Sequence, residues 1–209
     1  KCLSEATLRL VNILFGEYGL IVIEPQHSAL NSIFKPILRE ELQGSPSFKA
    51  VNSQVEHIKK GYNTSYTPQV NPREINLFYL TPNGRYRIEK NENTFHLNGT
   101  EQSFSEAEFI KLVETHPERF SPNVILRPVY QESILPNLCY LGGGGELAYW
   151  FQLNSTFQHF GIPFPILLLR NSALLYSKKL AKKIEKLNLE AADLFLKRNE
   201  LLNKKIRQI

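Results

Sequence analysis

The central stretch of the chain joins a short apolar run, a block of glycines and an amphipathic segment. Residues 138–141 form a continuous apolar run of the length of a buried strand. Four glycines follow directly, and after them the apolar side chains recur every three or four residues as far as Phe160, which predicts a helix over residues 146–160. Its apolar face would consist of Leu147, Trp150, Leu153, Phe157 and Phe160. Where a glycine loop connects a strand to the N-terminus of a helix in this way, the backbone N–H groups of the loop can face a ligand.

The first 70 residues predict three helices and one strand. Apolar spacing indicates helices at residues 4–15, 28–42 and 48–58. In the first of them, the residues expected to face the core are Leu10, Val11, Leu14 and Phe15. A four-residue apolar run at 20–23 predicts a strand that Pro25 ends. Pro36 predicts a kink or a new start inside the second helix.

Residues 71–120 carry two hairpin signals. Strands are predicted at 75–80 and 85–89 around the turn sequence Thr-Pro-Asn-Gly, and at 94–97 and 101–104 around Asn-Gly. Ser105 and Glu108 have the spacing of a capping box, which predicts a short helix directly after the last of these strands.

Two more strands and a helical tail complete the pattern. The apolar runs at residues 124–126 and 166–169 indicate buried strands. Ser172 is expected to cap a long helical tail, with a break near Asn188 where the apolar seam shifts. The elements together predict an α/β fold. We assign residues 1–70 and 136–176 to its core, 71–135 to a small antiparallel α+β insertion, and 177–209 to the tail.

Composition and charge narrow the class of protein. A hydrophobic content of 42% with 22% charged residues is ordinary for a soluble globular protein, and no apolar run approaches the roughly 20 residues that span a bilayer. Two cysteines far apart in the sequence favour a reducing cytoplasm over a disulfide scaffold. The chain contains no methionine, and we interpret it as an internal segment of a longer protein.

The net charge of +5 is concentrated in the tail. From residue 173 onward ten Lys or Arg residues stand against four acids, so the tail carries +6 and the remainder carries −1. The lysines fall opposite Leu180, Ile184 and Leu187, as they would on a solvated helix face. With only Tyr176 and Phe195 as interleaved aromatic residues, we expect no binding to nucleic acid.

Two interpretations of Gly142, Gly143, Gly144 and Gly145 stay open. The glycines either let the strand and helix pack closely or let the backbone approach a polar ligand. The run lacks the register of a dinucleotide fingerprint and has no following Lys-Ser or Lys-Thr, which excludes a P-loop. Glu146 either stabilises the first turn of the helix or orients an amine or a sugar hydroxyl, while Tyr149 and Trp150 could form the walls of a site.

The remaining site candidates follow predicted strands. Arg127 and Arg170 could each bind a carboxylate or phosphate through a planar fork of donors. The alternative for both is an ion pair with an acid such as Glu132. Pro128 interrupts the strand ladder directly after Arg127, so we expect the arginine to turn toward a cleft. The other residues that could line a cleft are Tyr130, Gln131 and Asn171.

No metal site or catalytic set stands out in the sequence. The five histidines are scattered and form no Cys/His pairs at ligand spacing. No Gly-x-Ser-x-Gly motif occurs. The catalytic residues stay unassigned.

Three blocks of the chain resemble the bacillithiol biosynthesis cysteine-adding enzymes. They are the sequences at residues 68–80 (PQVNPREINLFYL), 120–127 (FSPNVILR) and 127–150 (RPVYQESILPNLCYLGGGGELAYW). The resemblance implies that the chain is part of a Rossmann-like nucleotide-binding core, with an antiparallel β insertion, and that a coiled-coil domain begins near its end.

The resemblance also implies an activity. The full protein would add L-cysteine to the amino group of glucosaminyl-malate, and this segment alone would be inactive. Forming that amide needs an activated carboxylate, so ATP or another nucleotide is the natural cosubstrate, although the residues themselves do not show one. Any homodimer would form through the helical tail. The alternative is a non-catalytic scaffold whose basic helical tail binds a partner.

Overall fold

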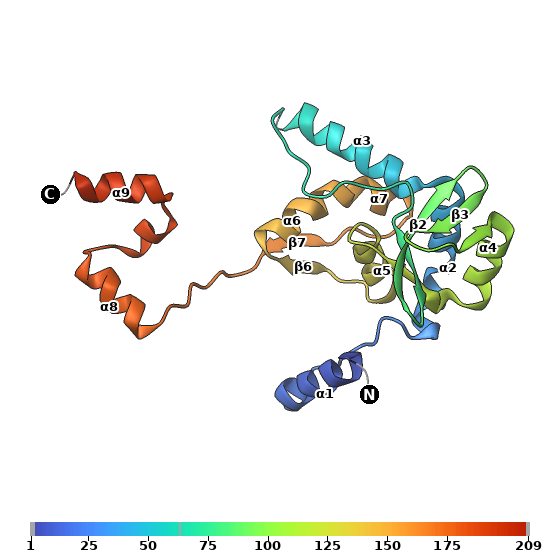
Figure 1. Cartoon of the computed structure of the whole chain (residues 1–209), viewed down its shortest axis with the longest axis horizontal. Coiled ribbons are helices and arrows are strands. Elements are labelled where there is room, and N and C mark those ends of the chain that lie inside the picture. Colours follow the sequence, from blue (N-terminus) through green and yellow to red (C-terminus); the bar gives the residue numbers. More distant parts are fainter. Residues whose placement is uncertain (1–2, 63, 208–209) are drawn as a thin grey trace. The chain divides into compact units, whose positions relative to one another are not determined.

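The computed structural model describes residues 3–62 and 64–207. The chain divides into two compact units, Lys1–Arg170 and Asn171–Ile209 (Figure 1). The predicted α/β class is confirmed, since the first unit contains two sheets surrounded by helices. The four domain boundaries proposed from the sequence stay a prediction.

The larger sheet has five antiparallel strands in the order β4-β3-β2-β1-β5. Their bounds are β1 Leu77–Thr81, β2 Gly84–Asn91, β3 Thr94–Leu97, β4 Ser103–Ser105 and β5 Phe120–Pro122. Both predicted hairpins are present, because β1 pairs with β2 as far as Thr81 and Gly84, and β3 pairs with β4. Ser105 and Glu108 form the predicted capping box at the start of α4, Glu106–Thr115.

Aromatic side chains fill the space between this sheet and α4. Phe109 of α4 stacks on Phe95 with the ring centroids 5.0 Å apart, and it also contacts Tyr79, Phe104 and Phe120. The alternation of buried residues along the strands places this cluster on one face of the sheet. These aromatic side chains belong to a larger hydrophobic core that also includes buried residues of other helices.

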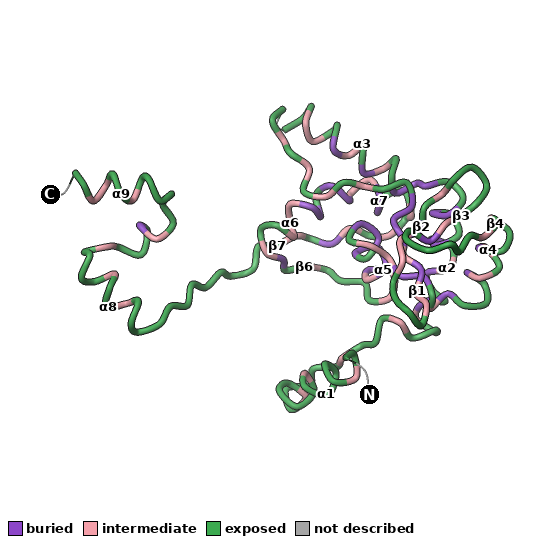
Figure 2. The backbone as a smooth tube through the Cα atoms, viewed as in Figure 1, coloured by how far each residue is buried: buried purple, intermediate pink, exposed green. Residues whose placement is uncertain are grey.

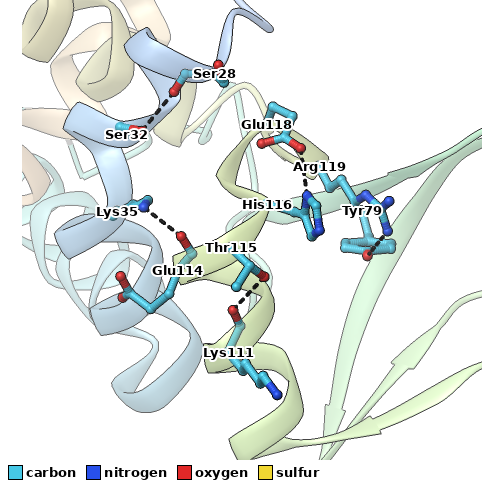
Figure 3. Close-up of polar contacts among 10 residues, drawn as sticks. All are labelled: Ser28, Ser32, Lys35, Tyr79, Lys111, Glu114, Thr115, His116, Glu118 and Arg119. Atoms are coloured by element: carbon cyan, nitrogen blue, oxygen red, sulfur yellow. Dashed lines mark hydrogen bonds and ion pairs between the residues drawn. The ribbon is translucent and has the colours of Figure 1, made fainter.

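Before the sheet lie α1 Leu3–Phe15, η1 Gly16–Tyr18, α2 Ser28–Gly44 and α3 Pro46–Gly61. Of these helices, α2 packs against α4 and against α3. The ammonium group of Lys35 on α2 donates a hydrogen bond of 2.6 Å to the carbonyl of Glu114 on α4 (Figure 3). Arg39 of α2 also pairs with the Glu114 carboxylate. Further along the chain, η2 (Pro117–Arg119) leads into β5. The guanidinium of Arg119 donates a hydrogen bond to the hydroxyl of Tyr79.

The smaller sheet is a strand–helix–strand unit built from the glycine stretch. Strands β6, Cys139–Gly142, and β7, Ile166–Leu169, pair in parallel. The connection between them contains α6 Gly144–Trp150, η3 Phe151–Leu153 and α7 Asn154–His159. The single helix predicted over residues 146–160 is thus broken by a 3₁₀ turn, although Trp150, Leu153 and Phe157 of its apolar face are fully buried as predicted.

Three sequence predictions are wrong in the N-terminal half and at α5, and Pro36 does not start a second helix. Residues 20–23 form no strand and lie in an exposed loop. The helix α1 buries none of its residues, so the side chains expected to face inward do not (Figure 2). Pro36 lies inside one continuous helix, α2. Residues 124–126 form the turn into α5, Leu126–Ile134, rather than a strand.

The two parallel strands are less buried than an apolar run predicts. Tyr140 and Leu167, which pair across the strands, pack against the core. Leu141 and Leu168 form the next pair and face the other side, where they are 63% and 51% exposed. Successive residues of a strand point to opposite faces, so one face of this sheet is covered by helices and the other is open.

The second unit contains α8 Lys178–Lys186, η4 Ala191–Phe195 and α9 Arg198–Ile206. Ser177, and not Ser172, caps its first helix by accepting a hydrogen bond from the N–H of Leu180. The predicted break near Asn188 is confirmed, since this residue has a left-handed φ of 46°. The described residues show short helices and not a continuous coiled coil.

Candidate functional site

The glycine loop adopts ordinary extended and helical backbone conformations. Gly142 ends β6, Gly143 is the N-cap of α6 and Gly144 opens the helix. None of the four glycines has a positive φ. A positive φ, which glycine adopts more readily than other residues, is therefore not the reason for glycine at these positions.

Close packing explains one of the glycines, Gly142. A Cβ atom on Gly142 would lie 2.8 Å from Cε1 of Tyr140 and 3.0 Å from Cδ2 of Leu147. On Gly143 it would lie 3.1 Å from Nη2 of Arg170. At Gly144 and Gly145 it would meet no atom within 4 Å. The loop thus has one closed position, Gly142, one position beside the flexible side chain of Arg170, Gly143, and two open positions.

Glu146 folds back over the loop. Its Oε2 accepts a hydrogen bond of 2.7 Å from the N–H of Gly143, and its Oε1 accepts one of 3.3 Å from the hydroxyl of Tyr140. Nη1 of Arg170 lies 3.8 Å from Oε2. The Gly143 N–H is therefore taken by the protein's own carboxylate, which leaves this donor unavailable to an anion.

Arg127 reaches the same group of side chains from α5. Its Nη2 donates a hydrogen bond of 2.7 Å to the hydroxyl of Tyr149 on α6. We call Arg127, Tyr140, Glu146, Tyr149 and Arg170 the Glu146 cluster. It contains two guanidinium groups and one carboxylate, so it carries a net charge of about +1 at neutral pH. Guanidinium forks suit carboxylates and phosphates, whereas the carboxylate suits an amine or hydroxyl.

The titration behaviour of the cluster follows from these contacts. The hydrogen bond from Gly143 and the nearby Arg170 hold the pKa of the Glu146 carboxyl below its usual range. Burial raises the pKa of the Tyr140 hydroxyl, and the neighbouring Tyr149 and Glu146 raise it further. At neutral pH Glu146 is thus an anion and Tyr140 a neutral hydrogen-bond donor.

The other predicted site residues lie outside this cluster. Tyr130 is buried in α5, where its hydroxyl donates to the carbonyl of Pro25, and Gln131 donates to its neighbour Glu132. Trp150 is fully buried and stacks on Tyr140 with the ring centroids 4.1 Å apart. Asn171 belongs to the second unit. The structure therefore brings together Arg127, Glu146, Tyr149 and Arg170 of the predicted set, around Gly143.

The alternative of an ion pair is found for Arg170, which pairs with Glu146 at 3.8 Å, but neither arginine pairs with Glu132. The carboxylate of Glu132 accepts hydrogen bonds of 2.8 and 3.0 Å from the backbone and side-chain amides of Asn137. Arg127 is exposed and bonded to Tyr149 instead. Its guanidinium has five N–H donors, so donors remain for a ligand.

A buried network of polar side chains fixes the position at which α5 begins. The sequence did not suggest this network. Asn123 accepts hydrogen bonds from the N–H groups of Ile125 and Leu126, and its own amide donates to Asn76. Asn76 in turn bonds to Glu41 and Ser47. The carbonyl of Asn123 accepts from the N–H of Arg127 at 2.8 Å. An asparagine ahead of a helix is a known start signal, but the apolar run after it favoured a strand.

The opposite side of α6 faces a cavity of about 1020 Å³. It lies between α3 and the α6–α7 connection, and Gly144, Leu147 and Ala148 contribute to its lining. The helix α6 thus separates the cavity from the Glu146 cluster. Both lie at the carboxyl ends of the parallel strands, where ligands of α/β sheets bind.

Among residues 3–62 and 64–207, no three His, Cys, Asp or Glu side chains are grouped so that they could hold a metal ion. Within the same residues, no helix combines the length and apolarity needed to cross a bilayer. Cys139 is a free thiol, whereas Cys2 lies outside the described part of the chain.

Comparison with known proteins identifies the family. Residues 1–171 match the family model described as "Bacillithiol biosynthesis BshC, N-terminal Rossmann-like domain". A protein of Flavobacterium johnsoniae named "Putative cysteine ligase BshC" is 50% identical over 201 residues, which are 96% of this chain and 37% of that protein. Relatives of the same name from Christiangramia forsetii and Salinibacter ruber are 47% and 34% identical, over 99% and 91% of this chain.

The chain spans less than two-fifths of the length of these relatives, at 37%, 38% and 35%. The resemblance seen in the three sequence blocks is confirmed by the family match. Because that match covers 171 of the 209 residues, the chain belongs to the BshC family of bacillithiol biosynthesis and contains its N-terminal Rossmann-like domain.

Proposed function

We propose that the full-length protein joins L-cysteine to the amino group of glucosaminyl-malate. The family match and the names of the relatives support a cysteine ligase. In this step the acceptor nitrogen attacks the carbonyl of an activated cysteine, a C–N bond forms, and the nitrogen loses a proton as the activating group leaves. A nucleotide such as ATP would supply the activating group.

The observation that carries the proposal is the mixed charge of the Glu146 cluster. The acceptor has two malate carboxylates and one amino group. Arg127 and Arg170 offer planar forks of donors for carboxylates, and Glu146 offers an acceptor for the amine. These three side chains come from α5, α6 and the end of β7, and they are held on one side of α6.

Glu146 is suited to orient the amine rather than to deprotonate it. A general base works best when its pKa is near the working pH. The pKa of Glu146 is instead lowered by the Gly143 N–H and by Arg170. We therefore assign Glu146 to positioning of the acceptor, and the proton acceptor of the reaction stays unassigned.

Arg127→Lys tests the acceptor site. Lysine keeps the charge but lacks the fork, so we expect acceptor affinity to fall by about 1.5–3 kcal/mol, the contribution of a charge-assisted hydrogen bond. Isothermal titration calorimetry of glucosaminyl-malate with the full-length protein measures this. The matched control is Arg87→Lys on β2, whose guanidinium forms an exposed ion pair with Glu89 at 3.8 Å.

The control variant should bind the acceptor as the wild type does. Equal affinity of Arg127→Lys and wild type, at equal melting temperature, would reduce Arg127 to a structural partner of Tyr149. If the wild-type protein binds no acceptor at all, the scaffold hypothesis gains and the ligase proposal fails.

A further inference from the structure

The first turn of α5 depends on one residue, Asn123. Its side-chain oxygen accepts hydrogen bonds from the N–H groups of Ile125 and Leu126 at 2.8 and 3.4 Å. Its carbonyl accepts a bond of 2.8 Å from the N–H of Arg127, and the next residue, Pro128, has no N–H. The N–H groups at the start of a helix have no partner within the helix itself. Asn123 therefore satisfies the donors of this turn as far as the proline.

Asn123 is itself fixed to a buried partner. Its N–H donates to the carbonyl of Asn76 at 3.0 Å, and its side-chain amide donates to Oδ1 of Asn76 at 2.8 Å. The N–H of Asn76 donates to Glu41 at 2.9 Å, and its side-chain amide donates to Ser47 at 2.7 Å. All three of these residues are fully buried. A buried polar network whose bonds are made is rigid, so Asn76 gives Asn123 a fixed position.

Arg127 is the exposed residue of this turn. Its neighbours Leu126 and Pro128 are buried, whereas Arg127 faces solvent and donates a hydrogen bond of 2.7 Å to the hydroxyl of Tyr149. The arginine is thus held at both ends, its backbone by Asn123 and its guanidinium by Tyr149. A long side chain that is already in place loses less rotamer freedom when it binds a ligand.

The start of α4 shows what a purely local helix start looks like. The side chain of Ser105 accepts a hydrogen bond of 3.3 Å from the N–H of Glu108, three residues later, and needs no partner from another element. Asn123 instead bonds to Asn76, 47 residues earlier, and through it to Glu41 of α2. The network around Asn123 therefore fixes where α5 lies as well as where it begins.

We propose that Asn123, anchored by Asn76, is a positioning residue for the acceptor substrate that acts through Arg127 without itself contacting the ligand. By fixing the backbone at Arg127, it holds the guanidinium fork where a carboxylate of the acceptor binds. Binding groups must be held within about 0.5 Å of the productive position. The inference rests on the proposed function, which assigns Arg127 to the acceptor, and deepens it by naming the residues that set its affinity from a distance.

A double-mutant cycle tests whether Asn123 acts through Arg127. Calorimetry with glucosaminyl-malate compares the full-length protein with Asn123→Ala, Arg127→Ala and the double variant. Asn123→Ala should weaken acceptor binding about tenfold, the lower end of the effect of losing a residue that orients a binding group. In the Arg127→Ala background the same change should weaken binding less than about twofold, because the group through which Asn123 acts is gone.

Asn123→Asp is a milder variant that separates anchoring from the start of the helix. The aspartate still accepts from the N–H groups of Ile125 and Leu126, but it cannot donate to Oδ1 of Asn76. Acceptor binding should therefore also fall in this variant, and again only while Arg127 is present.

Ser105→Ala is the matched control, because it removes the side-chain bond that starts α4. Both alanine variants should lower the melting temperature, but only Asn123→Ala should change acceptor affinity. An equal loss of affinity in both backgrounds would overturn the inference and leave the proposed function standing. Wild-type affinity in the folded Asn123→Ala and Asn123→Asp variants would do the same. A wild-type protein that binds no acceptor would overturn both.

Discussion

The four glycines show how differently neighbouring residues of one type are constrained. Gly142 is closed in by Tyr140 and Leu147, and Gly143 lies beside the flexible, exposed side chain of Arg170, while Gly144 and Gly145 face open space. The sequence indicated a special role for the run but could not assign it, because the distinction depends on side chains from β6, α6 and the end of β7. Of the two interpretations that the sequence left open, close packing accounts for Gly142, and approach of a ligand is open to Gly144 and Gly145.

Gly142→Ala and Gly144→Ala should therefore differ in stability. At Gly142 the added methyl group must displace Tyr140 or Leu147, and we expect a loss of about 1–3 kcal/mol, typical of overpacking. At Gly144 it meets nothing and replaces glycine in a helix, so stability should be unchanged or rise by up to about 1 kcal/mol. Urea unfolding of both variants measures this, and equal destabilisation would contradict the packing account.

At the scale of elements, local signals predicted the hairpins and the strand–glycine–helix unit. Turn sequences and the capping box of Ser105 and Glu108 act within a few residues, so they are visible in the sequence. The turn into α5 was missed because Asn123 is fixed by Asn76, which is 47 residues away. Apolar runs alone do not separate a short strand from the start of a buried helix.

The buried polar network at the start of α5 contains Glu41, which makes the free energy of unfolding depend on pH. Glu41 is fully buried and accepts hydrogen bonds from the hydroxyl and N–H of Ser47 and the N–H of Asn76. Burial raises the pKa of its carboxyl above the ordinary value of 4.5, although these hydrogen bonds oppose the rise. The folded state then binds more protons than the unfolded state between the two pKa values, so the free energy of unfolding falls as pH rises through that window.

Glu41→Gln should remove this dependence. The glutamine amide also places a donor opposite the donors of Ser47. We therefore expect the free energy of unfolding of the variant to be lower by about 1–3 kcal/mol at pH 7. Urea unfolding from pH 4.5 to 8 provides the measurement. The control is Glu56→Gln, an exposed residue of α3 paired with Lys59 at 3.1 Å. An identical slope with pH in wild type and Glu41→Gln would show that Glu41 does not titrate in this range.

At the scale of the whole molecule, the α/β class and the family were visible in the sequence, whereas strand burial was not. Leu141 and Leu168 form an exposed face because the parallel sheet has two strands in the first unit. In α/β proteins both faces of a parallel sheet are normally covered. The relatives are more than twice as long as the chain.

The helices of the tail also depend on polar contacts that the spacing of apolar residues does not show. Its residues form α8, η4 and α9 with a turn at Asn188, and Lys204 pairs with the buried Asp193. Short-range polar contacts of this kind compete with one long helix. Pairing of two copies through the tail, and the absence of nucleic-acid binding, stay predictions.

Product formation by the full-length protein tests the central claim most directly. The protein is incubated with L-cysteine, glucosaminyl-malate and ATP, and the products are identified by mass spectrometry. We predict that bacillithiol forms only when all three are present, and that Arg127→Lys lowers kcat/KM for the acceptor about 10- to 100-fold while Arg87→Lys does not. A folded protein that binds the acceptor but never yields the cysteine amide would contradict the account, as would equal rates for Arg127→Lys and the wild type.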